Sequence, residues 1–289
     1  MTTTEVAGIE ISKPDKVLFP GDGITKLELA RYYADIAEVM LPHLAERPIN
    51  MQRFPDGVDG SSFFEKRVPT HFPDWIDRVQ VDTAEGPQEQ VIVTDQRTLV
   101  YLANQACLTS HAWLSRSPAL AKPDQIVFDL DPSVDDVAAV RRATRITGEL
   151  LDQLGLSTFV KTTGSRGYHV QVPLRPEAEF DDVRSFAHAV AERLSENEPN
   201  LFTVEQRKNK RDDRVFVDVL RNAYGQTAVP PYALGVVPRW RHPSNGKSCR
   251  GSHRTSTPCL PYLVDWRSAP TRGPACFGAP RGFSVLERS

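Results

Sequence analysis

The stretch IVFDLDPS, Ile126 to Ser133, ends an apolar run with two aspartates and a proline. Residues two apart in a β-strand share a face, so Asp129 and Asp131 would lie on one face and Phe128 on the other. Like charges on one face repel unless a cation lies between them, and paired carboxylates suit Mg²⁺ or Mn²⁺. The pattern fits equally well a helix cap in which Asp131 or Ser133 begins the next helix.

A third carboxylate favours the metal interpretation. The stretch RVFVDVL (214–220) predicts a strand with Asp218 in its middle, on the same face as Phe216 and Leu220. A buried unpaired charge there would be costly. If this strand lies beside IVFDLD, the three carboxylates converge and would hold two metal ions for attack at a phosphorus centre.

The turn TTGSRG (162–167), followed by Tyr168 and His169, supplies donors for an anion. Glycines let backbone N–H groups approach phosphate closely, and the serine and arginine side chains add to them. By itself such a turn is more typical of a simple hairpin. A basic cluster precedes the strand of Asp218 and would otherwise be a solvated loop: Arg207, Lys208, Lys210, Arg211 and Arg214.

The surrounding sequence alternates strands and helices. Strands are expected at 48–54, 126–131, 157–161, 168–173 and 214–220, and helices at 134–154 and from Asp181 or Asp182 to about Asn197. Thr25 and Glu28 have capping-box spacing before an apolar stripe that reaches Met40. Because the turn at 162–167 is too short for a parallel crossover, we expect a mixed α+β fold with antiparallel pairing.

The bulk composition excludes several classes of protein. With 289 residues, 40% of them hydrophobic and 25% charged, the chain has the composition of a soluble globular protein. No apolar run approaches the ~20 residues of a membrane span, and the start lacks the pattern of a secretory signal. Four cysteines without a C-x-x-C pair argue against a disulfide framework or a standard zinc site. A cytoplasmic location is therefore expected.

Two adjacent aromatic residues stand out in the N-terminal part. In a strand Phe63 and Phe64 would point to opposite faces, so one would enter the core. The other, flanked by Arg53 and Lys66, would be free to stack on a nucleic-acid base.

Several stretches together resemble the polymerase domain of bacterial DNA ligase D, in the archaeo-eukaryotic primase superfamily. The resemblance runs in order from about Ile9 to Leu234 and rests on KPDKVLFPGDGITK, INMQRFPDGVDGSSFFEK, IVFDLDPS, TTGSRGYHVQVPL and RVFVDVLRNAYGQTAVPPY. It implies a primase-polymerase catalytic domain over residues 1–234, with central, largely antiparallel sheets flanked by helices.

The resemblance also implies roles for individual residues. Asp129, Asp131 and Asp218 would be the catalytic carboxylates that bind two Mn²⁺ or Mg²⁺ ions. The nucleotide contacts would be His111, Ser165, Arg166, Gly167, His169 and Arg211. The family often has lysine where this chain has Arg166, which keeps the charge but changes its geometry. The contacts to DNA would be Lys16, Lys26, Arg53, Phe63, Phe64 and Lys66, with the first two lysines on a 5′-phosphate and the phenylalanines on the template.

The implied activity is template-directed addition of NTPs or dNTPs at DNA gaps and breaks carrying a 5′-phosphate. The implied pathway is non-homologous end joining with Ku and a DNA ligase, at the nucleoid in the cytoplasm. The main alternative is a DNA-end-binding module without catalysis. A two-metal phosphoesterase, which the aspartates alone would permit, is disfavoured by the ordered family motifs.

The resemblance stops after Leu234. Residues 235–289 carry eight Arg and one Lys against one Asp and one Glu, and they lack periodicity. Shifting the codons by one base recovers the family pattern, so we hypothesise that the reading frame slipped near Leu234; a genuine, divergent basic tail is the alternative. Gly235 stands where the family has a triphosphate-binding arginine, a loss worth about 1.5–3 kcal/mol that would impair activity.

Overall fold

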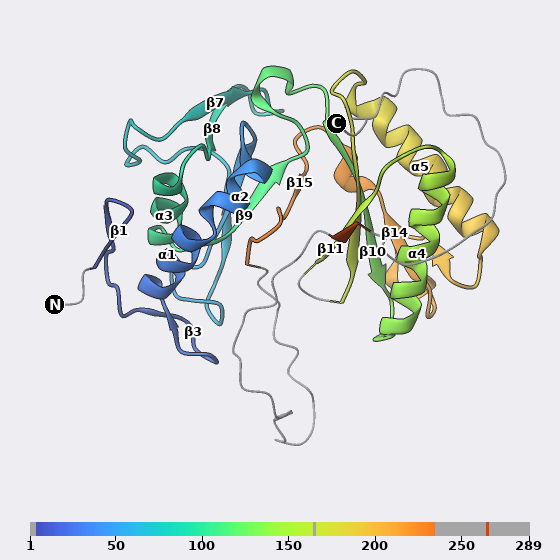
Figure 1. Cartoon of the computed structure of the whole chain (residues 1–289), viewed down its shortest axis with the longest axis horizontal. Helices are drawn as coiled ribbons and strands as arrows, with labels where there is room; N and C mark the ends of the chain where they lie inside the picture. The colour runs from blue at the N-terminus through green and yellow to red at the C-terminus, as the bar shows by residue number, and fades with distance from the viewer. Residues whose placement is uncertain (1–3, 164–165, 235–263, 266–289) are drawn as a thin grey trace.

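The computed structural model describes residues 4–163, 166–234 and 264–265 of the chain. Two six-stranded sheets, each with its own helices, form two halves that lie side by side (Figure 1). Among the described strand pairs only β13 and β14 run parallel. The expected mixed α+β class with largely antiparallel sheets is therefore confirmed.

The N-terminal half is built on the sheet β15-β9-β5-β8-β7, with β6 paired to β5. Its elements are β1 (Glu5–Val6), β2 (Ile9–Glu10), β3 (Val17–Phe19), β4 (Ile24–Thr25), α1 (Lys26–Asp35), α2 (Ala37–Leu44), β5 (Pro48–Arg53), β6 (Phe63–Glu65), β7 (Arg78–Val81), β8 (Gln88–Ile92), α3 (Gln96–Asn104), β9 (Cys107–Trp113) and β15 (Thr227–Ala228). The capping box of Thr25 and Glu28 is confirmed at the start of α1. The apolar stripe that follows spans two helices, which meet at Ile36.

The C-terminal half is built on the sheet β13-β14-β10-β12-β11-β16. Its elements are β10 (Gln125–Pro132), α4 (Val137–Gln153), β11 (Phe159–Thr162), β12 (Tyr168–Pro173), α5 (Phe180–Asn197), β13 (Phe202–Thr203), β14 (Val215–Asp218) and β16 (Val264–Asp265), with short 3₁₀ turns at Ser117–Ala119, Lys208–Lys210 and Leu220–Asn222. Of the basic tail only Val264–Asp265 is described, so the predicted frame shift and Gly235 lie outside the described residues.

Two helices begin elsewhere than predicted. The N-cap of α4 is Asp136, whose carboxylate accepts from the Ala139 N–H at 2.9 Å. Asp131 stays inside β10, so the interpretation of Asp131 or Ser133 as a helix cap is wrong. Helix α5 is likewise preceded by Glu179, and the acidic residues expected to cap it lie in its first turn.

The strand that carries Asp218 is shorter than predicted. It ends at Asp218 itself because the carboxylate accepts the Leu220 N–H at 2.8 Å and turns the chain into a 3₁₀ turn. The side chain of Asn222 then binds both the N–H and the C=O of Val127, at 2.8 Å each. The side-chain amide of Asn222 therefore continues the pairing with the β10 backbone after β14 has ended.

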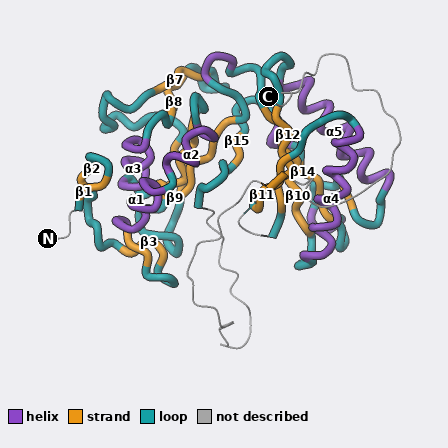
Figure 2. Tube along the Cα trace, viewed as in Figure 1, coloured by secondary structure: helices purple, strands orange, loops and turns teal. Residues whose placement is uncertain are grey.

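The two faces of β10 meet different surroundings. Ile126, Phe128 and Leu130 are fully buried in a core shared with α4 and α5, which lie on the outer side of the sheet (Figure 2). Val127 points the other way and packs in a small cluster with Ala228 of β15, a strand of the N-terminal half. The face that carries the aspartates is therefore turned toward the other half. None of the helices in the described part of the chain is long and apolar enough to cross a membrane.

Candidate active site between the two sheets

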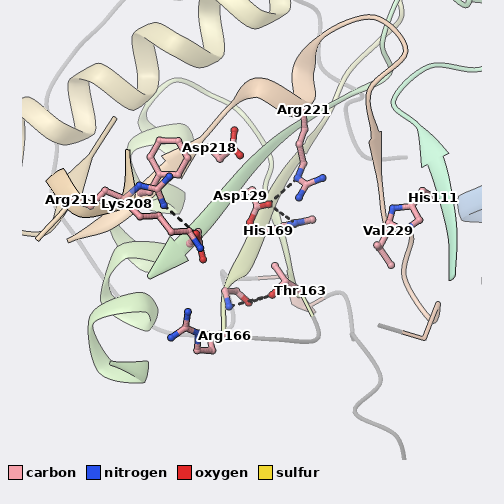
Figure 3. Close-up of a pocket in the computed structure, with 13 residues that line it drawn as sticks. His111, Asp129, Thr163, Arg166, His169, Lys208, Arg211, Asp218, Arg221 and Val229 are labelled. Atoms are coloured by element: carbon pink, nitrogen blue, oxygen red, sulfur yellow. Dashed lines mark hydrogen bonds and ion pairs between the residues drawn. The ribbon is translucent and has the colours of Figure 1, made fainter. Parts of the chain in front are cut away.

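The three predicted carboxylates lie at one place in the sheet. Asp129 of β10 directly opposes Asp218 of β14 in the antiparallel register, and Asp131 follows two residues along. All three line a cavity of about 450 Å³, shown in Figure 3. Its other lining residues are His111, Thr163, Arg166, Gly167, His169, Lys208, Arg211, Phe216, Arg221 and Val229.

Two of the carboxylates are held by cationic side chains. Arg221 donates from Nε to Asp129 Oδ2 at 2.8 Å, and His169 Nε2 lies 3.3 Å from the same oxygen. Burial opposes ionisation of Asp129, but His169 and Arg221 outweigh it and hold its pKa below the usual range. Asp131 pairs with Arg211 at 3.2 Å, and that guanidinium lies 3.8 Å from the ring centroid of Phe216.

Asp218 has a different environment. Burial raises its pKa, the Leu220 N–H opposes this rise, and the facing Asp129 carboxylate adds to it. Two carboxylates opposed across a strand pair and a third two residues along form an oxygen donor set that suits a hard divalent cation. Within the described ranges no three such groups are already arranged as a metal cluster, because each carboxylate is turned to a different hydrogen-bond donor.

Gly167, at the end of the turn predicted to bind phosphate, packs against β10. Thr163 and Gly167 close it through hydrogen bonds of 3.1–3.2 Å. A Cβ atom on Gly167 would lie 2.4 Å from the Leu130 carbonyl oxygen, so only glycine allows the turn to approach β10 between its aspartates. Arg166 lines the cavity. Ser165, also predicted here, lies outside the described residues.

Two histidines reach the cavity from opposite halves. His169 faces Asp129 in the register of β12 and β10. His111 comes from β9, where its Nε2 lies 3.1 Å from Gln52 Oε1. Burial, together with nearby cationic groups, lowers the pKa of each imidazole to about 4. Both predicted nucleotide-contacting histidines therefore line the cavity of the three carboxylates, and His169 contacts Asp129.

Sequence reasoning missed two cationic residues of the site. Arg221 follows Asp218 by three residues in a stretch that the resemblance covered, and the Asn222 anchor on β10 places it beside Asp129. Lys161 is buried on β11, and burial lowers its pKa to about 7. A lysine among the apolar residues of a predicted strand was the available signal.

A second cavity, of about 250 Å³, brings together three predicted DNA contacts in the N-terminal half. Lys16, Lys26 and Arg53 line it. Burial lowers the pKa of Lys26, and the charge of Lys16 adds to the effect. Lys16 pairs with Asp56 at 3.0 Å. Such a concentration of positive charge is suited to an anion.

The paired phenylalanines contradict the prediction that one enters the core. Phe63 and Phe64 on β6 are both exposed, by 45% and 53%. The physical reason is that β6 pairs only with β5 in the described part of the sheet and has no core beneath it. Arg53 lies over the Phe63 ring and forms an ion pair with Glu65. Lys66 is exposed just after β6.

Comparison with known proteins confirms the family resemblance. Residues 25–240 match the family model of the LigD primase-polymerase domain. A relative from Mycobacterium tuberculosis, the multifunctional non-homologous end joining DNA repair protein LigD, is 36% identical over 242 residues, covering 78% of this chain and 31% of the relative. The multifunctional non-homologous end joining protein LigD of Pseudomonas aeruginosa is 33% identical over 271 residues, 90% of this chain and 32% of the relative.

The chain therefore spans about a third of the length of these relatives. A solved structure, the polymerase domain of Mycobacterium tuberculosis ligase D in complex with DNA, superposes with a TM-score of 0.75 at 35% identity. The match covers 78% of this chain and 82% of that one. These matches agree with the three aspartates and the turn at Gly167, and they show that this chain belongs to the LigD primase-polymerase domain family.

Proposed function

We propose that this chain is a template-directed nucleotidyltransferase that adds NTPs or dNTPs at DNA gaps and breaks during non-homologous end joining. The observation that carries the proposal is the single cavity in which Asp129, Asp131 and Asp218 face cationic side chains. Negative groups would bind metal ions there, and positive groups would bind the phosphates of a nucleotide. The relatives named for end joining, and the one solved with DNA, support the choice.

Asp129, Asp131 and Asp218 would hold the two divalent ions, Mn²⁺ or Mg²⁺. When bound, these ions would activate a 3′-hydroxyl and neutralise the leaving pyrophosphate. Arg211 and Arg221 now pair with two of the carboxylates. We expect both guanidiniums to turn to phosphate oxygens when a nucleotide enters, because Arg binds phosphate and carboxylate with the same planar geometry.

The N-terminal half would hold the DNA. Lys16, Lys26 and Arg53 would bind a 5′-phosphate in their cavity, since its anionic oxygens suit a cluster of ammonium and guanidinium groups. Phe63 and Phe64 would stack on template bases, which are sequence-tolerant partners of exposed aromatic rings. We further propose that Ku recruits this chain to DNA ends and that a DNA ligase seals the extended product, at the nucleoid in the cytoplasm.

The test is primer extension on gapped DNA with a 5′-phosphate, supplied with Mn²⁺ and either NTPs or dNTPs. The wild-type chain should extend the primer, and Asp129→Ala should abolish extension while DNA-end binding persists. Extension that survives Asp129→Ala would refute the proposed site.

A second candidate is a DNA-end-binding module without catalysis. It is favoured by the separation of the two cavities, which share no lining residue. The basic cavity would therefore bind DNA ends without help from the carboxylates. Loss of the family arginine at position 235 is a further reason to keep it. Binding to 5′-phosphorylated ends without any extension by the wild-type chain would select this candidate.

A further inference from the structure

Lys161 is a buried charged residue at the inner edge of the candidate site, and the proposed function does not use it. It lies on β11 directly opposite His169 of β12. Its Nζ lies 2.8 Å from His169 Nδ1 and donates to the Val229 carbonyl at 2.6 Å. A lysine is rarely buried unless it is paired, so these contacts need an explanation.

The two ring nitrogens of His169 face groups of opposite hydrogen-bonding character. Nδ1 faces the Lys161 ammonium, which only donates, and Nε2 faces the Asp129 carboxylate, which only accepts. A neutral imidazole has one donor and one acceptor nitrogen. Only one tautomer satisfies both neighbours: the one with its proton on Nε2 and its lone pair on Nδ1.

We propose that Lys161 is a positioning residue that holds His169 in the Nε2–H tautomer, so that the imidazole is a fixed hydrogen-bond donor toward Asp129 and the nucleotide cavity. In the other tautomer a lone pair would face the Asp129 carboxylate and repel it. The expected effect on catalysis rests on the proposed function, because it requires Asp129 to be a catalytic carboxylate. The assignment of the tautomer does not rest on the proposed function.

The geometry itself requires a neutral imidazole, because Nδ1 can accept from the Lys161 ammonium only through a lone pair. A neutral Lys161 amine could also accept from Nδ1–H, whereas the Asp129 carboxylate requires the proton on Nε2 whatever the protonation state of the lysine. Val229 also lines the cavity, and Lys161 therefore holds two parts of its wall, one from each side.

The test is the ¹⁵N NMR spectrum of histidine-labelled protein without metal or nucleotide, with the His169 signals assigned by comparison with His169→Gln. The wild-type spectrum should show a protonated Nε2 and an unprotonated Nδ1. Lys161→Met, which keeps an unbranched side chain one atom shorter and removes the donor, should yield a mixture of tautomers. Lys208→Met, which removes a lysine that lines the cavity, should leave the His169 signals unchanged.

A wild-type His169 that is protonated on Nδ1, or on both nitrogens, overturns the proposal without any variant. So does a folded Lys161→Met protein with unchanged His169 signals. In primer extension, Lys161→Met should weaken the apparent nucleotide affinity or turnover about tenfold, the scale of one charge-assisted hydrogen bond, and leave DNA-end binding within twofold. If the wild-type chain extends no primer, the proposed function fails while the tautomer assignment still stands or falls on its spectrum.

Discussion

The two halves of the molecule use charge in different ways. In the C-terminal half, Asp129 and Asp131 pair with Arg221 and Arg211 at 2.8 and 3.2 Å, and both arginines lie in the segments that flank β14. In the N-terminal half, Lys16 and Lys26 line a basic cavity, and the aromatic rings of β6 are exposed to solvent. The buried Asp129 is neutralised by a guanidinium, whereas the buried Lys26 donates to the Ser12 hydroxyl, which leaves its positive charge available to an anionic ligand.

The comparison predicts that changes in the C-terminal half alter chemistry. Asp218→Asn should lower primer extension at least about 1,000-fold, since several kcal/mol of charge stabilisation by metal would be lost. The measurement is the extension rate on gapped DNA with Mn²⁺. Full activity of this variant would show that the carboxylates of the C-terminal half do not carry the chemistry.

The same variant carries a pH test. The pKa of Asp218 is raised above 3.8, chiefly by burial. The folded state therefore binds this proton more tightly than the unfolded state does. As a result, the free energy of unfolding falls as pH rises from the unfolded pKa through the folded pKa. Asp218→Asn should unfold at a higher temperature than wild type near pH 7, and this advantage should disappear in acid below the unfolded pKa.

Asp124→Ala tests the link between the halves. Arg47, which is buried before β5, donates to Asp124 at 2.6 Å, and Arg116 donates to the same oxygen at 2.7 Å. Removing the carboxylate leaves the buried Arg47 guanidinium without its counter-charge, although its bond to the Trp113 carbonyl remains. The free energy of unfolding should fall by about 3–5 kcal/mol. Urea unfolding measures it. The exposed Asp135→Ala variant is the control and should change stability by less than about 0.5 kcal/mol.

Phe64→Ala tests the exposed side of the comparison. The ring lies edge-on to His111, with 5.1 Å between centroids, and is more than half exposed. We expect binding of template-containing DNA to weaken by about 1–3 kcal/mol, the scale of one base stacked on an aromatic ring. Fluorescence anisotropy with a labelled gapped duplex measures it, and Val39→Ala, which removes exposed apolar surface on α2, is the control. A large loss of stability with unchanged binding would contradict the assignment.

Lys26→Gln should have the smallest effect. Lys26 donates to Ser12 Oγ at 3.1 Å and lines the basic cavity beside Lys16. Its loss should reduce the preference for a 5′-phosphate over a 5′-hydroxyl by about tenfold or less, and the salt dependence of binding should decrease by about one unit of slope. If the wild-type chain binds 5′-phosphate and 5′-hydroxyl ends equally well, this cavity is not part of the proposed DNA interface.

Much of the candidate site could be predicted because its signals are local. The two-residue period of a strand placed Asp129 and Asp131 on one face, away from Phe128, and that placement is confirmed. The spacing of Thr25 and Glu28 predicted a helix start that the structure confirms. These features depend on neighbours within one element, where backbone geometry leaves few choices.

The remaining features depend on partners far along the chain. The exposure of both Phe63 and Phe64 follows from the edge position of β6, which no two-residue pattern encodes. The contact of Arg221 with Asp129 needs the Asn222 anchor on β10, 95 residues away along the chain.

The sequence by itself therefore determined the α+β class, the shared face of the aspartates and the glycine turn beside them. The tertiary structure decided which charges face one another: Asp218 against Asp129, Arg211 against Asp131, and Lys161 against His169. The reason is physical. A local pattern sets the direction of a side chain, but strand register and long-range packing set the group that it meets.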